Sequence, residues 1–142
     1  MRHAFQIVLL ILLVACTGLA AAAGPSRSQR AKLVQTQDAY TAAIRWSDFD
    51  SAQEYLDPEY RLAHPMTDLE RERYRQLQVS GYRVRGSGQL ADGSIERRVE
   101  LGVVNRNTQA ERIVQGRERW RWDPQAKRWW QAEGLPDLWQ GQ

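Results

Sequence analysis

The amino-acid sequence predicts an α+β fold, in which N-terminal helices pack on a curved, four-stranded antiparallel meander sheet. Helical periodicity comes first along the chain, and a long region of alternating apolar and polar residues follows it. Short turns divide that second region into four expected strands, at 76–89, 94–106, 109–122 and 127–133. Strands that are consecutive in the sequence and joined by short turns pair antiparallel, so we expect a meander.

The second strand has the clearest alternation. Its residues of one parity are apolar, namely Ile95, Val99, Leu101 and Val103. Only Arg97 interrupts this face. A period of two residues indicates a half-buried strand with one face in water. Asp92 and Gly93 precede the strand and suit a tight hairpin, because both residue types tolerate a positive φ.

The first strand changes parity part of the way along. Leu77 and Val79 share one parity, whereas Tyr82 and Val84 take the other, and the change falls at Ser80-Gly81. An inserted bulge residue has this effect, so we expect a β-bulge, with Gly81 as the bulge residue, that leaves all four side chains on the apolar face. Bulges bend and twist long strands, and the sheet is therefore expected to be curved.

Helices are expected at 28–46, 48–56 and 67–75. The first has an apolar face that comprises Leu33, Tyr40, Ala43, Ile44 and Trp46. Ser47 is the expected N-cap of the second helix, and Asp57-Pro58 is expected to end it. The stretch 60–65 reads as irregular, and Thr67 to Glu70 forms a capping box for the third helix.

The N-terminus resembles an export signal. Residues 1–15 contain an apolar run, 5–15, that is too short to span a bilayer but suits a signal peptide. The stretch Leu13-Val14-Ala15-Cys16 resembles the lipobox of bacterial lipoproteins, which implies cleavage before Cys16 and attachment of lipid to it. The alternative is a soluble periplasmic protein that is cut among Ala20 to Ala23.

The lipobox interpretation divides the chain into three expected segments: the signal peptide 1–15, a lipidated and flexible tether at 16–29, and a single α+β domain at 30–142. Thr17 follows the lipobox cysteine, and the absence of an aspartate there favours the outer membrane. Leu138 and Trp139 are expected to pack onto the domain.

Composition excludes several classes of function. The formal charge is +3, from 20 basic and 17 acidic residues, and this small, dispersed excess indicates no anionic partner, nucleic acids included. His64 is the only histidine after the signal, and the chain has one cysteine, so we expect neither a metal site nor a cofactor. No disulfide can form within the chain, and the fold must depend on its core.

Three stretches resemble the nuclear transport factor 2-like superfamily, a cone-shaped α+β fold. They are Ile44 to Ala52, the stop at Leu56-Asp57-Pro58, and the strand end Trp120 to Asp123, within a resemblance over about 28–134. The chain leaves little room for the extra hairpin that many members carry before their third helix. The resemblance implies that the sheet and helices form a cone-like domain.

The superfamily includes enzymes such as ketosteroid isomerase and scytalone dehydratase, which use Asp, Tyr or His inside the cone. The residues of this chain that would meet there are Asp38, Tyr40, Tyr60, His64 and Glu100. No motif matches those enzymes position by position, so the resemblance assigns no catalytic role to any of them.

The third strand ends in tryptophans whose role is left open. Trp120 and Trp122 share a parity with Val114, but Gly116 and Glu118 interrupt that face. These tryptophans either belong to the core or line a concavity that the first helix closes. In the second interpretation the candidate pocket residues are Tyr40, Ile44, Trp120 and Trp122.

The expected function is that of a non-catalytic lipoprotein, anchored through Cys16 in the outer membrane and facing the periplasm. Its domain would bind an envelope protein or a small apolar ligand. Two alternatives remain: a small-molecule enzyme of the isomerase or dehydratase kind, and an accessory subunit of an envelope assembly. The sequence leaves the oligomeric state open, a dimer included.

Overall fold

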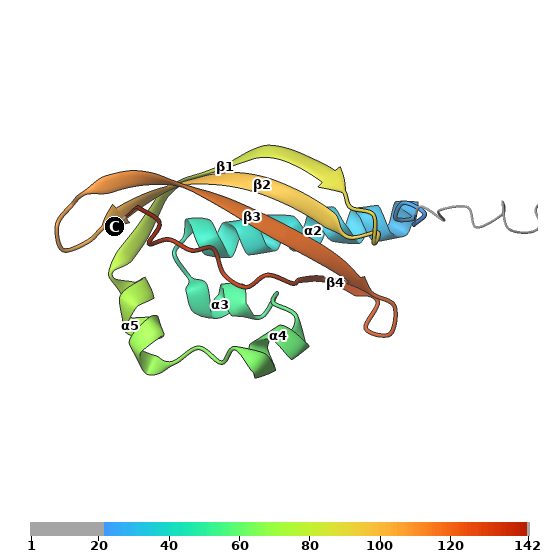
Figure 1. Cartoon of the computed structure of the whole chain (residues 1–142), viewed down its shortest axis with the longest axis horizontal. Coiled ribbons are helices and arrows are strands. Elements are labelled where there is room, and N and C mark those ends of the chain that lie inside the picture. The colour runs from blue at the N-terminus through green and yellow to red at the C-terminus, as the bar shows by residue number, and fades with distance from the viewer. Residues whose placement is uncertain (1–21, 142) are drawn as a thin grey trace, which may run out of the picture.

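The computed structural model describes residues 22–141, in which helices are followed by an open antiparallel sheet (Figure 1). The helices are α2 (Arg27–Arg45), α3 (Phe49–Gln53), α4 (Pro58–Ala63) and α5 (Asp68–Arg75). The strands are β1 (Leu77–Gln89), β2 (Ile95–Asn105), β3 (Glu111–Asp123) and β4 (Arg128–Gln131). Neighbouring strands pair antiparallel in the order β1-β2-β3-β4. The predicted α+β class and the four-stranded meander are confirmed.

The end of α2 differs from the prediction. Ser47 does not cap the next helix; Asp48 does, by accepting the Ser51 N–H at 3.0 Å. Ser47 instead has a left-handed φ of 59° and turns the chain out of α2. Its hydroxyl oxygen accepts the Val79 N–H at 2.9 Å, and this bond ties the helix end to β1.

The segment that was predicted to be irregular contains a helix. Asp57 is the N-cap of α4 and accepts the Glu59 N–H at 2.9 Å, and Pro58 occupies the first helical turn. Proline ends a helix that precedes it, but its fixed φ and missing N–H also suit the start of a new one. The prediction used only the first of these properties. The capping box of Thr67 and Glu70 opens α5, as expected.

β1 contains two bulges. The 13 residues of β1 pair with the 11 residues of β2, and the register skips Ser80 and Arg85. The first bulge is confirmed at Ser80-Gly81, but the unpaired residue is Ser80, and Gly81 pairs with Gly102. The second went unnoticed because residues 86–89 include no apolar side chain that would reveal a change of face. Tyr82 and Val84 lie opposite the buried Leu101 and Val99 and thus share their face, although Val84 remains 47% exposed.

The C-terminal segment, residues 132–141, runs beside the part of β3 that does not pair with β4. β4 pairs only with Trp120–Asp123, so the rest of β3 lacks a strand partner on that side. The Ala132 N–H donates to the Arg119 carbonyl at 2.8 Å, and the Arg112 guanidinium donates to the Leu138 carbonyl. Leu138 is buried and Trp139 is partly buried, which confirms that both pack onto the domain.

One cluster of buried side chains joins the helices, the strands and the C-terminal segment. Its largest fully buried members include Trp120, Trp129, Tyr40, Ile44 and Leu138. Figure 1 shows α2 running from the end of the molecule where the chain enters toward the other end. The β1–β2 and β3–β4 turns lie at the entry end, and the β2–β3 turn and α5 lie at the other (Figure 1).

Candidate functional site

The predicted pocket is filled by its own residues. Tyr40, Ile44 and Trp120 have no accessible surface, and the Tyr40 ring meets Trp120 edge-on, with centroids 5.4 Å apart. Only Trp122 is half-buried. The packing therefore favours the core interpretation of these tryptophans over a concavity between β3 and α2.

Glycine in the apolar face of β3 has a packing reason. A Cβ on Gly116 would lie 3.1 Å from Val99 Cγ2 and 3.5 Å from Leu101 Cδ1. The space beside this glycine is thus occupied by β2 side chains. Gly116 leaves room for these side chains and, with Leu135 and Pro136, lines a surface hollow of about 470 Å³.

The two polar interruptions predicted on separate strands form a single buried ion pair. Arg97 and Glu118 are direct cross-strand partners, with Nε and Oε2 2.8 Å apart, and both side chains are buried. Residue parity placed each of them on the inner face, but parity carries no information on the register between strands. Sequence reasoning therefore missed the pair while naming both of its members.

Neighbouring side chains saturate this pair. Glu118 also accepts the indole N–H of Trp120 at 3.0 Å and the hydroxyl of Tyr82. Arg97 donates to the hydroxyls of Thr41 and Tyr82, each at 2.9 Å. Burial, and then the Glu118 carboxylate, raise the pKa of Tyr82, so this phenol stays neutral across the physiological range. A carboxylate with three donors around it is a structural group rather than a free general base.

The other candidate residues for a cone site do not meet Tyr40. Asp38 is exposed on α2, and Glu100 pairs with Arg85, Oε1 to Nη2 2.7 Å, on the opposite face of the sheet. The rings of Tyr60 and His64 stack on α4 with centroids 4.4 Å apart, and His64 is exposed. The structure brings none of these four into a common site with Tyr40.

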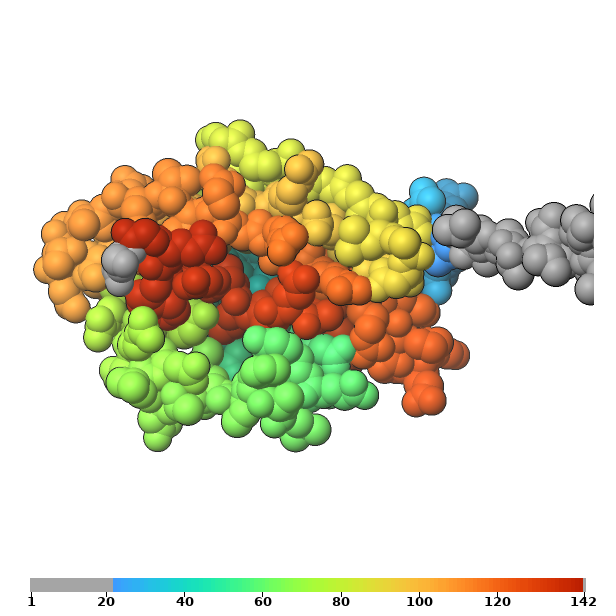
Figure 2. Space-filling model, in the orientation of Figure 1, coloured from blue at the N-terminus to red at the C-terminus, as the bar shows by residue number. Residues whose placement is uncertain are grey.

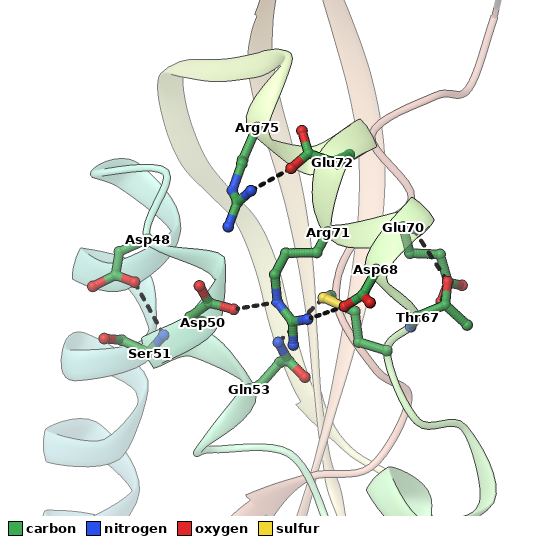
Figure 3. Close-up of polar contacts among 11 residues, drawn as sticks. Asp48, Asp50, Ser51, Gln53, Thr67, Asp68, Glu70, Arg71, Glu72 and Arg75 are labelled. Carbon is green, nitrogen blue, oxygen red and sulfur yellow. Dashed lines mark hydrogen bonds and ion pairs between the residues drawn. The ribbon is translucent and has the colours of Figure 1, made fainter.

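His64 does line a surface hollow of about 310 Å³ between α4 and α5. Figure 2 shows the surface hollowed where α4 and α5 face the C-terminal segment. Arg71 crosses its wall between the carboxylates of Asp50 and Asp68, each 3.2 Å away (Figure 3). The Gln53 amide completes the wall by donating to the Met66 sulfur at 3.2 Å.

The carboxylates of this region are used as helix caps. The Glu70 pKa is lowered, first by the Thr67 N–H and then by the Thr67 hydroxyl. The Asp48 pKa is lowered by the Ser51 side chain and then by its backbone N–H. Figure 3 shows each of these caps at the start of its own helix, and the Arg71–Asp50 ion pair that links α5 to α3. The arrangement joins two helices through ion pairs and caps.

Trp46 is the most conspicuous exposed side chain. The prediction placed it on the apolar face of the first helix, but it is 84% exposed. α2 ends at Arg45, and Trp46 is its C-cap with φ −83° and ψ 1°, so its side chain leaves the helical stripe. It borders a hollow of about 350 Å³ between the end of α2 and Val79–Gly81 on the free edge of β1.

Trp122, the fourth predicted pocket residue, lies at the entry end of the molecule. It lines a hollow of about 420 Å³ together with Trp129, Arg121 and residues 22–23. Trp129 belongs to the core cluster and Trp122 packs against it, so this hollow lies at the edge of the core.

Comparison with known protein families, curated proteins and solved structures gave no match. Within residues 22–141, no group of three or more His, Cys, Asp or Glu side chains is placed to hold a metal ion. No described helix is both long and apolar enough to cross a bilayer. The predicted signal peptide, Cys16 and the first part of the predicted tether lie outside the described residues.

Proposed function

We propose that this protein is a non-catalytic bacterial lipoprotein that is anchored through Cys16 and presents a protein-binding domain to the periplasm. The lipobox-like stretch before Cys16 supports the anchor. The outer membrane is the proposed site, because Thr17 stands where an aspartate would favour retention in the inner membrane.

We also propose that α2 closes the sheet into a cone of the nuclear transport factor 2-like kind. The bonds that link α2 to the sheet support this shape: Arg97 of β2 donates to Thr41, and Trp129 of β4 donates to the Gln29 carbonyl at 2.8 Å. The two bulges of β1 supply curvature in the strand at the sheet edge.

The filled interior is the observation that favours a protein partner over the alternatives. An isomerase, a dehydratase or a carrier of a small apolar ligand needs a cavity in which polar groups converge on the ligand. Here the corresponding volume holds Tyr40, Trp120 and the saturated Arg97–Glu118 pair. A function carried by the outer surface is more consistent with this packing.

Trp46 marks the surface at which we place the partner. Tryptophan and arginine are enriched among the residues that dominate protein interfaces, and exposed Arg45 lies directly beside Trp46. The 19 residues of α2 extend about 28 Å from the chain entry to this point. Trp46 is therefore held at the end of the domain that faces away from the anchor.

Photo-crosslinking in intact cells tests this proposal. A photoreactive amino acid at position 46 should yield a discrete adduct with an envelope protein. The matched control is position 113 on β3, where Ile113 is also apolar and exposed, at 59%. The same adducts from both positions, or none from position 46, would contradict the proposal, and an adduct of twice the chain mass would identify a second copy as the partner.

A further inference from the structure

The entry end of the domain is constrained to lie near the proposed anchor. Ala22 is the sixth residue after Cys16, and an extended chain of six residue steps spans at most about 20 Å. The Ala22 carbonyl accepts the Gln89 side-chain amide at 3.2 Å, so the chain enters beside the β1–β2 turn. A lipid on Cys16 would hold this end of the molecule close to the headgroups.

Cations gather at the same end. They come from the start of α2 and from the β3–β4 turn, and they are Arg27, Arg30, Lys32, Lys127 and Arg128. The Lys32 ammonium donates to the Lys127 carbonyl at 3.0 Å, which brings the two segments together. None of the five forms an ion pair within residues 22–141, and all but Arg128 are exposed.

Carboxylates near these cations are already engaged. Asp92 in the β1–β2 turn pairs with Arg119, and its pKa is lowered to about 2, chiefly by hydrogen bonds from Ser94. Asp123 accepts the backbone N–H groups of Gln125 and Ala126, at 2.9 and 3.0 Å. The cations at this end are thus left to interact with an external anion.

The start of α2 carries positive charge, which is unfavourable beside the positive end of the helix dipole. Arg27 and Arg30 occupy the first turn, which contains no acidic residue. Cations at a helix N-terminus are unfavourable, because the unpaired N–H groups there already carry a partial positive charge. Arg30 donates to the Pro25 carbonyl at 3.0 Å, but within residues 22–141 neither arginine forms an ion pair that would offset this cost. A local arrangement that costs stability is typical of a functional surface.

An aromatic side chain accompanies the cations. Trp122 is half-buried, and Lys32 Nζ lies 5.8 Å from its ring centroid. The Trp122 ring packs against the buried ring of Trp129, with ring centroids 5.6 Å apart. Trp129 also donates its indole N–H to the Gln29 carbonyl. Tryptophan and basic side chains together are characteristic of surfaces that lie at the headgroup level of a bilayer.

We propose that this basic end, defined by Arg27, Arg30, Lys32, Trp122, Lys127 and Arg128, binds the anionic phospholipid headgroups of the membrane that carries the anchor. The inference deepens the proposed function and rests on it for the position of the bilayer. Contact through this end orients the domain, so that Trp46 at the far end of α2 points into the periplasm.

Vesicle binding of the mature chain, residues 16–142 with Cys16→Ser, tests the proposal without the lipid. Each cation near an anionic surface is worth about a fivefold change in affinity. We expect at least tenfold tighter binding to phosphatidylglycerol-containing vesicles than to phosphatidylcholine vesicles. Lys32→Glu/Lys127→Glu should weaken that binding at least tenfold, and the milder Lys32→Gln/Lys127→Gln should weaken it in the same direction.

The control is Arg45→Glu/Arg61→Glu, which makes the same change in net charge at exposed positions away from the basic end. It should weaken binding less than threefold. Equal losses for the two charge reversals, no preference for anionic vesicles, or competition by millimolar inorganic phosphate at constant ionic strength would overturn the proposal. Because this chain carries no lipid, failure here is distinct from failure of the lipoprotein assignment.

Quenching of tryptophan fluorescence by brominated lipids gives the orientation. With the lipidated protein in anionic vesicles, Trp122→Phe should remove more of the quenching than Trp46→Phe, because only Trp122 lies at the basic end. Equal effects, or a larger effect of Trp46→Phe, would overturn the orientation and with it the assignment of this surface.

Discussion

The buried pair of Arg97 and Glu118 sets the energetics of the interior at the scale of single residues. Two charges removed from water cost much of what their attraction returns, so the pair contributes less to stability than the loss of either member would suggest. Its surroundings, Tyr82, Thr41 and Trp120, satisfy the remaining donors and acceptors. The pair thus fixes which residues of β2 and β3 lie opposite each other.

Substitution of one member should be more damaging than substitution of both. Glu118→Leu leaves the Arg97 guanidinium buried without its anion, and we expect a loss of about 3–5 kcal/mol in the free energy of unfolding. Arg97→Met/Glu118→Leu should lose clearly less than Glu118→Leu alone, as measured by urea denaturation. Additive losses in the double variant would show that the two side chains are not coupled.

One buried and two partly buried tyrosines predict how stability depends on alkaline pH. Burial raises the pKa of Tyr40, Tyr74 and Tyr82 above the ordinary value of 10. A raised pKa stabilises the fold below pH 10 and loses this effect above it, because the unfolded chain ionises first. Each phenol should contribute a slope of about 1.4 kcal/mol per pH unit above pH 10.

Absorbance at 295 nm and urea denaturation between pH 9 and 12 measure this effect together. Tyr82→Phe should make the decline in the free energy of unfolding above pH 10 shallower by the slope that one phenol contributes. If Tyr40, Tyr74 and Tyr82 all ionise near pH 10 while the chain remains folded, the burial of their hydroxyls is wrong.

At the scale of elements, the bulge in β1 decides which side chains reach the core. Ser80 has no partner in the register between β1 and β2, so its removal leaves the side chains of Leu77 and Val79 on the inner face of the sheet. Removal of Gln78, which is also exposed, places either Leu77 or Val79 on the wrong face. We expect the second deletion to cost more by about 1.5–3 kcal/mol, the value of burying one aliphatic side chain.

Urea midpoints of the two deletion variants check this prediction. Both remove one exposed polar residue from the same strand, but only Gln78 is part of the ladder. Ser80 additionally donates its hydroxyl to Glu111 at 2.7 Å, a contact that works against the expected difference. A deletion of Ser80 that is as damaging as the deletion of Gln78 would contradict the bulge assignment.

Elements with strong periodicity were predictable from the sequence, and their ends were not. β2 was found because its alternation is long, and α5 because Thr67 and Glu70 form a capping box. α4 was missed because Asp57-Pro58 suits both the end of one helix and the start of the next. Trp46 was misplaced because periodicity does not mark the residue at which a helix stops.

In the candidate site, the direction of side chains was predictable from the sequence, and the presence of a cavity was not. Helical periodicity correctly assigned Tyr40 and Ile44 to the inner side of α2, and strand parity did the same for Trp120; all three are buried. Whether inward side chains leave a cavity depends on volume and register, which a pattern of apolar residues does not encode. The Arg97–Glu118 pair and the close approach at Gly116 fill the space that the sequence left open.

At the scale of the whole molecule, α2 separates two surfaces of different chemistry. Its first turn belongs to the basic end, and its last residue, Arg45, leads directly into the exposed Trp46. If the anchor holds the first surface against the membrane, the second is displayed about 28 Å away. The account therefore depends most on the anchor at Cys16.

Metabolic labelling with radioactive palmitate tests the anchor most directly. The native protein should incorporate label and fractionate with the membrane, and Cys16→Ser should do neither, because it removes the thiol to which the lipid is attached. Thr17→Ser, an adjacent hydroxyl-conserving change, should label like the native protein. Equal labelling of the native protein and Cys16→Ser, or no label in either, would contradict the account.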